Sequence, residues 1–416
     1  MDTSLLPLAY LLPAGLLLIA WSSGPAERLR ESALAAGVMV AVSVVAYFSF
    51  GFALQFGGIG LSPISPAGLL GLDRAWTPFH SAVGRWSLIG LEGFFVNTDG
   101  SPAGLALVEL LVAHRLPMAI AAGLIPILAL GTRVNRVALI ASGIVSTAFV
   151  FPVVGAWIWG GGWLAMTGVN LNFGHGAIDP AGSGVVFLAA GSVAWIALWL
   201  FGQRDQAQSA DLSIPPQPAL AFVGAILLGA GWSAWTMSDP LLSPYRDTDF
   251  VGVSGIGLIS AAASTVVVVL YFWLASGRIH PTEAARGWAA GWIAVSASAM
   301  FISPTSAILI GIIAGGMLIG GQHLVEKVGR LPDRAGHVAM CSMAGAWGLI
   351  ALGLFADGTF GAGWHGVTAS VRGLLASDPG QFTAQLAAAA AIATYAICVS
   401  TILLSPLSLI TRRSIR

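Results

Sequence analysis

Residues that could do chemistry are few in this chain, and the first group lies in IDPAGSGVVF, residues 178–187. The carboxylate of Asp179 precedes Pro180, and small residues follow as far as Phe187. Aspartate is a good N-cap and proline is favoured at the first helical position, so the pair predicts that a helix starts here. A buried carboxylate also makes the local potential negative and would help to recruit a cation. The two interpretations are compatible.

A second group is the pair His114 and Arg115 in VELLVAHRLPMAI. If this apolar stretch crosses a membrane, a charged arginine in its middle costs at least about 2.5–3.5 kcal/mol unless it faces a polar cavity or a partner. Arg115 therefore either pairs with an acid on a neighbouring span or at a subunit interface, or it faces a pore. In a pore it would repel cations, because the Coulomb energy grows as the local dielectric constant falls.

A third group is His337, which precedes Cys341 by four residues and so shares one face of a helix with it. One interpretation is that His337 and His114 both provide displaced polar stations in a rearranged pore. The other is that His337 snorkels to the membrane boundary near Arg334. Two further histidines, His175 and His365, fall in predicted outer loops, where we expect them to be solvated.

Patterns typical of enzymes and cofactor sites are absent from the sequence. It contains no nucleophile triad and no metal-ligand spacing, and WGGGW lacks the lysine and Ser/Thr of a phosphate-binding loop. The cysteines, Cys341 and Cys398, both fall in apolar stretches, which argues against a disulfide framework or a metal cluster. We therefore expect no enzymatic activity, no cofactor and no metal.

The elements that position these residues are predicted to be membrane helices. A chain of 416 residues with 56% hydrophobic and 9% charged residues is too apolar for a soluble protein of this length. A span needs about 20 mostly apolar residues. The first stretch lacks a basic region and a cleavage signal, so it predicts a retained span. The eleven stretches that qualify are 4–22, 33–56, 104–131, 136–159, 182–202, 218–237, 252–275, 286–303, 305–324, 335–356 and 385–409.

The distribution of basic residues predicts the orientation of the chain in the membrane. The net charge is zero, which gives no indication of a nucleic-acid partner. With the N-terminus outside, thirteen Lys and Arg residues fall on the cytoplasmic side and four on the opposite side, namely Arg74, Arg85, Arg246 and Arg372. This asymmetry predicts a multi-pass protein of the cell membrane with an outer N-terminus and a cytoplasmic C-terminus.

The chain is predicted to form one membrane domain, 1–416, that contains an internal repeat. FLAAGSVAW, from residue 187, and CSMAGAW, from residue 341, each place a glycine four residues after their first residue. Five spans per repeat require the second copy to be inverted. The repeats would cover about 4–202 and 218–356, with a last span at 385–409, although Ala/Gly-rich helices also resemble one another by chance. Between spans two and three we expect an outer loop, 57–103, with one short helix at about 76–91.

Several local motifs resemble those of the ammonium transporter family, the Amt/Mep/Rh proteins. They follow the family's order and spacing over nearly the whole chain. The resemblance implies an all-α bundle of eleven helices, built from two inverted five-helix repeats and a final helix, usually a homotrimer with one narrow pore for ammonium or ammonia in each subunit. The motifs are SFGFALQFGG (49–58), WIWGGGWLAMTG (157–168), GAIDPAGSGVVF (176–187), GWSAW (231–235), SGRIHPTEAARGWAAGW (276–292) and GHVAMCSMAGAWGLIALGLFADG (336–358).

The centre of the pore departs from the family pattern. Where the family carries two histidines that hydrogen-bond to each other inside the pore, this chain matches Phe187 and Cys341. Phenylalanine has no donor or acceptor, and a buried thiol is a weak donor, so neither replaces an imidazole. The resemblance also implies an outer recruitment site at Trp159, where a cation over the indole could gain about 0.5–2 kcal/mol, together with Asp179.

Other pore positions match the family less well. The family's gating phenylalanines correspond to His114 and Met118 in the third span and to Trp235 in the sixth. The serine that lines the family's outer site falls at Ser238 or at Asp239, because the alignment after GWSAW is ambiguous by one residue.

Two functions are consistent with these positions. The first is an ammonium or ammonia channel, or a pore for a similarly small solute, in which the missing histidine relay predicts electroneutral flux. The second is a non-conducting member in which Phe187 and Arg115 close the pore and the bundle acts as a sensor or scaffold. The C-terminal tail is short, which puts regulation by a docking PII-type protein in doubt.

Overall fold

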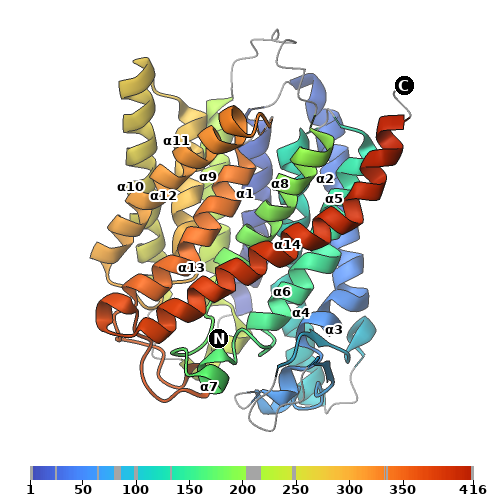
Figure 1. Cartoon of the computed structure of the whole chain (residues 1–416), viewed down its shortest axis with the longest axis vertical. Helices are drawn as coiled ribbons and strands as arrows, with labels where there is room; N and C mark the ends of the chain where they lie inside the picture. Colours follow the sequence, from blue (N-terminus) through green and yellow to red (C-terminus); the bar gives the residue numbers. More distant parts are fainter. Residues whose placement is uncertain are drawn as a thin grey trace.

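Helices make up almost the whole of the computed structural model. It describes residues 3–23, 26–62, 65–78, 86–97, 102–131, 134–202, 217–245, 250–331, 333 and 336–413. The helices lie side by side in a bundle, and α14 (Pro379–Arg413) crosses the others obliquely (Figure 1). The helical segments of the first half are α1 (Leu11–Trp21), α2 (Ala26–Ala46), α3 (Phe52–Phe56), α4 (Pro102–Leu130), α5 (Arg136–Ile144), α6 (Phe151–Ile158), α7 (Thr167–Leu171) and α8 (Ala189–Phe201). Those of the second half are α9 (Pro218–Met237), α10 (Phe250–Ser276), α11 (Pro281–Val295), α12 (Pro304–Gln322), α13 (Ala344–Phe355) and α14 (Pro379–Arg413).

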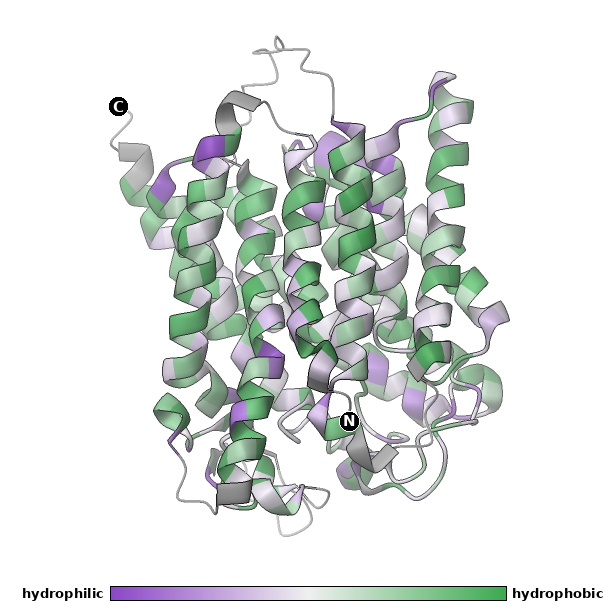
Figure 2. Ribbon diagram, turned by 180° about the vertical axis from the view of Figure 1, so that it is seen from behind, coloured by the Kyte–Doolittle hydropathy of each residue, from purple (hydrophilic) through white to green (hydrophobic). Residues whose placement is uncertain are grey.

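The prediction of an all-α membrane bundle is confirmed. Among the described residues, nine helices are long and apolar enough to cross a bilayer, and Ala339–Phe355 is a shorter apolar helix. The remaining predicted span, 286–303, corresponds to α11, which ends at Val295, earlier than expected, because turns and bends follow as far as Ile302. Hydrophobic residues dominate the middle of the helices and hydrophilic ones gather near their ends, as expected of a protein in lipid (Figure 2).

Several long spans are continuous helices interrupted by one wide turn. A π-helical turn joins α2 to α3 at Tyr47–Gly51, and another joins α5 to α6 at Val145–Val150. Similar turns, Ser183–Leu188 and Ala339–Met343, lead into α8 and α13. Wide turns of this kind are rare and occur frequently at functional sites.

Glycines let the first helix of each predicted repeat approach the other closely. A methyl group placed on Gly15 of α1 would lie 2.5 Å from the carbonyl oxygen of Gly224 in α9, and one on Gly224 would lie 2.9 Å from the carbonyl oxygen of Gly15. Neither position has room for a side chain. Small residues are what membrane helices use for such contacts, since lipid provides no hydrophobic force between them.

Two aspartates cap two central helices with the same geometry. The Asp179 carboxylate accepts hydrogen bonds of 2.7, 2.8 and 2.8 Å from the backbone amides of residues 183–185. The Asp333 carboxylate accepts hydrogen bonds of 3.1, 2.9 and 3.4 Å from those of residues 337–339. In both cases the donors are four, five and six residues after the acid. Carboxylates in this position satisfy amides that have no partner within the helix.

The prediction that the fifth span begins at Asp179 needs a correction. Its first turn begins at Ser183, and Pro180 does not occupy the first helical position. The chain makes a sharp turn at Gly182, whose φ of +84° suits glycine, and this turn folds the capping carboxylate back onto the helix start. Gly336 has a φ of +66° at the matching place before the second capped helix.

The two capped helices cross at glycines twelve residues beyond their aspartates. A methyl group on Gly191 would lie 2.6 Å from the backbone nitrogen of Ser342, and one on Gly345 would lie 2.6 Å from that of Leu188. Leu188 and Ser342 each lie nine residues beyond a capping aspartate, so the two contacts join equivalent positions of the two helices. This reciprocal contact is what an internal repeat related by a two-fold axis would produce.

The loop between α3 and α4 differs from the prediction. Instead of a helix at about 76–91, a short antiparallel ribbon pairs β1 (Ala75–Trp76) with β2 (Ile89–Gly90). Residues 79–85 of the predicted helix lie outside the described residues.

Candidate functional site

A cavity of about 260 Å³ opens at the end of the bundle where the α3–α4 and α13–α14 loops lie. We call it the vestibule. Its walls combine apolar side chains with a few convergent polar groups, which is typical of ligand sites. The residues that line it are Ile59, Ser62, Ser65, Pro66, Arg115, Ile158, Trp159, Gly161, Asp179, Pro180, Asp239, Leu241, Leu242 and 362–365.

Arg115 lies against the vestibule and is almost entirely buried, with 1% of its surface exposed. Its Nη2 donates to Asp239, at 3.1 Å from Oδ2 and 3.3 Å from Oδ1. Its guanidinium carbon is 4.5 Å from the ring centre of Trp159 and 5.1 Å from that of Trp235, with Phe56 at 5.7 Å. Of the two alternatives that the sequence left open, the structure shows the pairing with an acid, and Arg115 also lines the vestibule.

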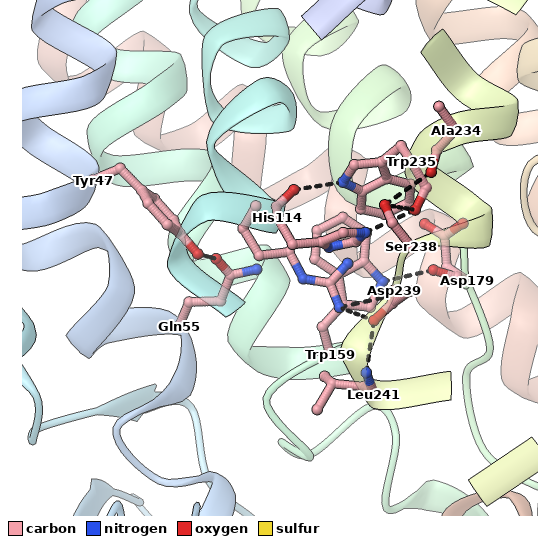
Figure 3. Close-up of polar contacts among 11 residues, drawn as sticks. Tyr47, Gln55, His114, Trp159, Asp179, Ala234, Trp235, Ser238, Asp239 and Leu241 are labelled. Atoms are coloured by element: carbon pink, nitrogen blue, oxygen red, sulfur yellow. Dashed lines mark hydrogen bonds and ion pairs between the residues drawn. The ribbon is translucent and has the colours of Figure 1, made fainter. Parts of the chain in front are cut away.

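The two elements that hold this arginine are α4 and the C-terminal end of α9. His114 and Trp235 lock them together, since the His114 Nε2 lies 2.7 Å from the Trp235 carbonyl oxygen and the Trp235 Nε1 donates to the His114 carbonyl oxygen at 2.7 Å. Their rings stack with centres 4.7 Å apart. Because a carbonyl only accepts, the His114 Nε2 must carry the proton in this arrangement. Figure 3 shows these side chains converging with Trp159 and Asp239.

The sequence left two positions open after GWSAW, and Asp239 is the one that lines the vestibule. Asp239 lines the vestibule, and its Oδ1 also accepts from the Leu241 amide at 2.8 Å. Ser238 does not line the cavity, and its hydroxyl donates to the Ala234 carbonyl of its own helix at 2.8 Å. Its place in the recruitment site stays a prediction. A carboxylate at this place makes it possible to hold an arginine there.

Trp159 and Asp179, which the sequence assigned to the recruitment site, lie together in the structure. The Trp159 Nε1 donates to the backbone carbonyl of Asp179 at 2.6 Å, and both residues line the vestibule. Trp159 also lies 5.6 Å from Trp235 between ring centres. The Asp179 carboxylate, however, is engaged by the three amides that it caps, so its free acceptor capacity is small.

Phe187 and Cys341 are equivalent in position, each eight residues beyond one of the capping aspartates. Both are fully buried in the core, and neither lines the vestibule. Met118 is likewise fully buried, one turn beyond His114 on α4. The predicted pore centre is therefore an apolar interior in which no side chain at these three positions can relay a proton.

His337 does not snorkel to the membrane boundary. It is fully buried, and its backbone amide is one of the donors to Asp333. Arg334, which would have accompanied it at the boundary, lies outside the described residues.

His175 and His365 were expected to be solvated, but both are buried. The His365 Nδ1 donates to the His175 carbonyl oxygen at 2.8 Å, and the His175 Nε2 lies 2.7 Å from the Ala369 carbonyl oxygen. Burial lowers the pKa of both rings, that of His365 to about 4. His365 also lines the vestibule. The stretch GAGWHGV gave no signal for this, because the contact depends on a loop nearly two hundred residues away.

Two glutamines of α14 hold the segment that leads to Asp179. The Gln381 side chain accepts from the His175 amide at 2.8 Å and donates to the Gly176 carbonyl at 2.9 Å. One turn later, the Gln385 side chain accepts from the Ile178 amide and donates to its carbonyl, both at 2.8 Å. Each glutamine side-chain amide thus makes the pair of backbone hydrogen bonds that a neighbouring β-strand would otherwise make. The sequence did not suggest these contacts.

Within the ranges that the structure describes, no group of three or more His, Cys, Asp or Glu residues is arranged to hold a metal ion.

Comparison with known proteins places this geometry in a family. The model of the Ammonium Transporter Family matches residues 11–415. The "Ammonium transporter Amt2" of Archaeoglobus fulgidus is 33% identical, over 84% of this chain and 69% of that protein. An "Ammonium transporter" of Bacillus subtilis is 26% identical, over 82% of this chain and 79% of the relative.

Solved structures agree in fold. A structure titled "Sensor Amt Protein" superposes with a TM-score of 0.75 at 22% identity, covering 99% of this chain and 92% of the other. Candida albicans Mep2 superposes with a TM-score of 0.74 at 20% identity, covering 96% and 82%. The match over nearly the whole length and the multi-pass helical bundle lead to one conclusion: this chain belongs to the ammonium transporter family.

Proposed function

We propose that this chain is a non-conducting member of the ammonium transporter family, which serves in the membrane as a sensor or scaffold subunit. The observation that supports this is the position of Arg115. Its guanidinium stacks on Trp159 and Trp235 and pairs with Asp239, so that the protein's own cation fills the aromatic site where an ammonium ion would be recruited.

Electrostatics supports the same conclusion. A second monovalent cation about 5 Å from the guanidinium would be repelled by about 3 kcal/mol at an effective dielectric constant of 20. The nearest carboxylate, Asp239, is already paired with Arg115 and offers little net attraction. To reach the indole face, an ammonium ion would have to displace a tethered cation that is held by two rings and a carboxylate.

A second candidate is an electroneutral pore for ammonia or another small neutral solute. It is favoured by the apolar, fully buried pair Phe187 and Cys341, which could admit a neutral molecule but no proton relay. This candidate requires Arg115 to leave the pathway, which the first does not.

The remaining features of the proposal follow from the sequence. The protein would be a homotrimer of the cell membrane with its N-terminus outside and its C-terminus in the cytoplasm, and it would have no enzymatic activity. The repeats would cover about 4–202 and 218–356, with a last span at 385–409.

Flux measurements on purified protein test the proposal. Proteoliposomes are exposed to a jump in ammonium while the internal pH is recorded, with empty liposomes as the baseline and the reconstituted Archaeoglobus fulgidus relative as the positive control. We expect the internal pH to follow the baseline. Alkalinisation faster than baseline would overturn the non-conducting assignment in favour of the second candidate.

A further inference from the structure

The vestibule contains buried polar atoms that no protein group satisfies. Of the three Arg115 nitrogens that carry protons, only Nη2 is bonded, and Nε and Nη1 have no partner in the part of the chain that the structure describes. The hydroxyl of Ser62, in the loop between α3 and α4, is also buried without a partner among those residues. Both residues line the same cavity. Buried polar groups are normally hydrogen-bonded, so these atoms call for a partner that enters the cavity.

His365 adds an acceptor to this set. Its Nδ1 lies 2.8 Å from the His175 carbonyl oxygen, so Nδ1 must carry the proton. Burial keeps the ring neutral at ordinary pH, and its Nε2 therefore retains a lone pair. The vestibule thus offers donors from Arg115, a donor or acceptor from Ser62 and an acceptor from His365, between apolar walls such as Trp159 and Leu241.

The charges around the cavity select against ions of either sign. Arg115 repels cations and already occupies the aromatic site. Anions meet two carboxylates, Asp179 and Asp239, one of which already pairs with the arginine. A neutral molecule with a carbonyl oxygen and N–H groups can satisfy all three residues without adding charge. The oxygen would accept from Arg115, and the N–H groups would donate to Ser62 and His365.

We propose that the vestibule binds a small neutral molecule of the urea and simple carboxamide class. Its carbonyl oxygen accepts from the free N–H groups of Arg115, and its N–H groups donate to Ser62 and His365. A cavity of about 260 Å³ holds such a molecule with a short apolar group against the indole of Trp159. The assignment goes beyond the proposed function and names a ligand class for the site, whether or not the pore conducts.

Three probes of one shape test this assignment. Propionamide, propionate and propylammonium share an apolar body and differ in charge. Binding of each to the full-length protein in detergent is measured by calorimetry. We expect saturable binding of propionamide and at least about tenfold weaker binding of the two ions, since each ion leaves a buried charge or donor unmatched.

Two serine variants locate the site. Ser62→Ala removes a hydroxyl that has no protein partner, and we expect it to weaken propionamide binding about fivefold, the usual effect of one hydrogen bond. Ser264→Ala is the matched control, because the Ser264 hydroxyl is likewise buried without a partner among the described residues but Ser264 does not line the cavity. We expect it to bind like wild type.

Three results would overturn the assignment: no saturable binding of propionamide, tighter binding of either ion, or equal effects of the two serine variants. The first would mean that water alone satisfies these atoms. Since calorimetry in detergent involves no flux, its failure is distinct from that of the non-conducting assignment.

Discussion

At the scale of single residues, Arg115 is the feature on which the proposal of a non-conducting protein rests. An arginine in the middle of a span is tolerated only with a partner, and here Asp239, 124 positions later, provides it. The aromatic rings around the guanidinium add cation–π attraction on a desolvated site. Trp159, Trp235 and Asp239 thus hold a fixed cation of the protein itself.

Asp239→Asn should destabilise the protein strongly. The asparagine keeps an acceptor for the Leu241 amide, so the change isolates the charge and leaves Arg115 buried without a counter-ion. Breaking a buried pair in this way costs about 3–5 kcal/mol. The measurement is the thermal unfolding temperature in detergent.

The double variant Arg115→Met/Asp239→Asn is the control for that change. With the guanidinium removed no charge remains unpaired, and most of the lost stability should return. An unfolding temperature of Asp239→Asn equal to that of wild type would show that the ion pair does not hold Arg115 in place.

His365 makes stability depend on pH. Burial lowers its folded-state pKa to about 4, below the ordinary value near 6.5, so the stability that the neutral ring contributes is present above pH 6.5 and is lost as the pH falls towards 4. We expect the unfolding temperature to fall between pH 7 and pH 4.5, and to fall less in His365→Asn, which tolerates the left-handed backbone at this position.

The exposed His280 provides the comparison for this measurement. His280→Asn should reproduce the wild-type dependence on pH. If His365→Asn shows the same fall as wild type, the titration of His365 does not contribute to stability over this range.

At the scale of elements, α14 connects the vestibule to the opposite end of the bundle. It runs obliquely across the other helices from the loop end to the C-terminus (Figure 1). Gln381 and Gln385 in its first turns clamp the backbone that leads to Asp179. A shift of this helix would therefore move the capping residue of α8 and the vestibule wall, which suits a sensor.

Gln385→Leu should loosen this connection. The change leaves the Ile178 amide and carbonyl without their partner in the core, at about 1–3 kcal/mol for each group. We expect a lower unfolding temperature and faster hydrogen exchange at residues 176–179. Thr383→Ala, on the exposed side of the same turn, should change both by little. Equal behaviour of the two variants would contradict the role of the clamp.

At the scale of the whole molecule, the sequence predicted what depends on local composition. Apolar stretches of span length gave the bundle, since a membrane imposes one solution on the backbone. The predicted repeat rested on Gly191 and Gly345, and the motif D-x-A-G twelve residues earlier, at Asp179 and Asp333, is a stronger signal for it in the sequence.

Contacts between distant segments could not be predicted. The pairing of Arg115 with Asp239, the burial of His365 and the glutamine clamps all join positions more than a hundred residues apart. Hydropathy says that such residues are in the membrane or in a loop, but not which partner each one meets. The ribbon of β1 and β2 was missed because the turn residues of that loop fit several local structures.

The most direct test of the account is to record membrane current and internal pH together in proteoliposomes after an ammonium jump, for the wild type and for Arg115→Met/Asp239→Asn. If the tethered guanidinium closes the pathway, the wild type gives no current and no alkalinisation above empty liposomes. In the double variant, no guanidinium lies over Trp159 and Trp235. A sustained ammonium-dependent current through the wild type would contradict the account.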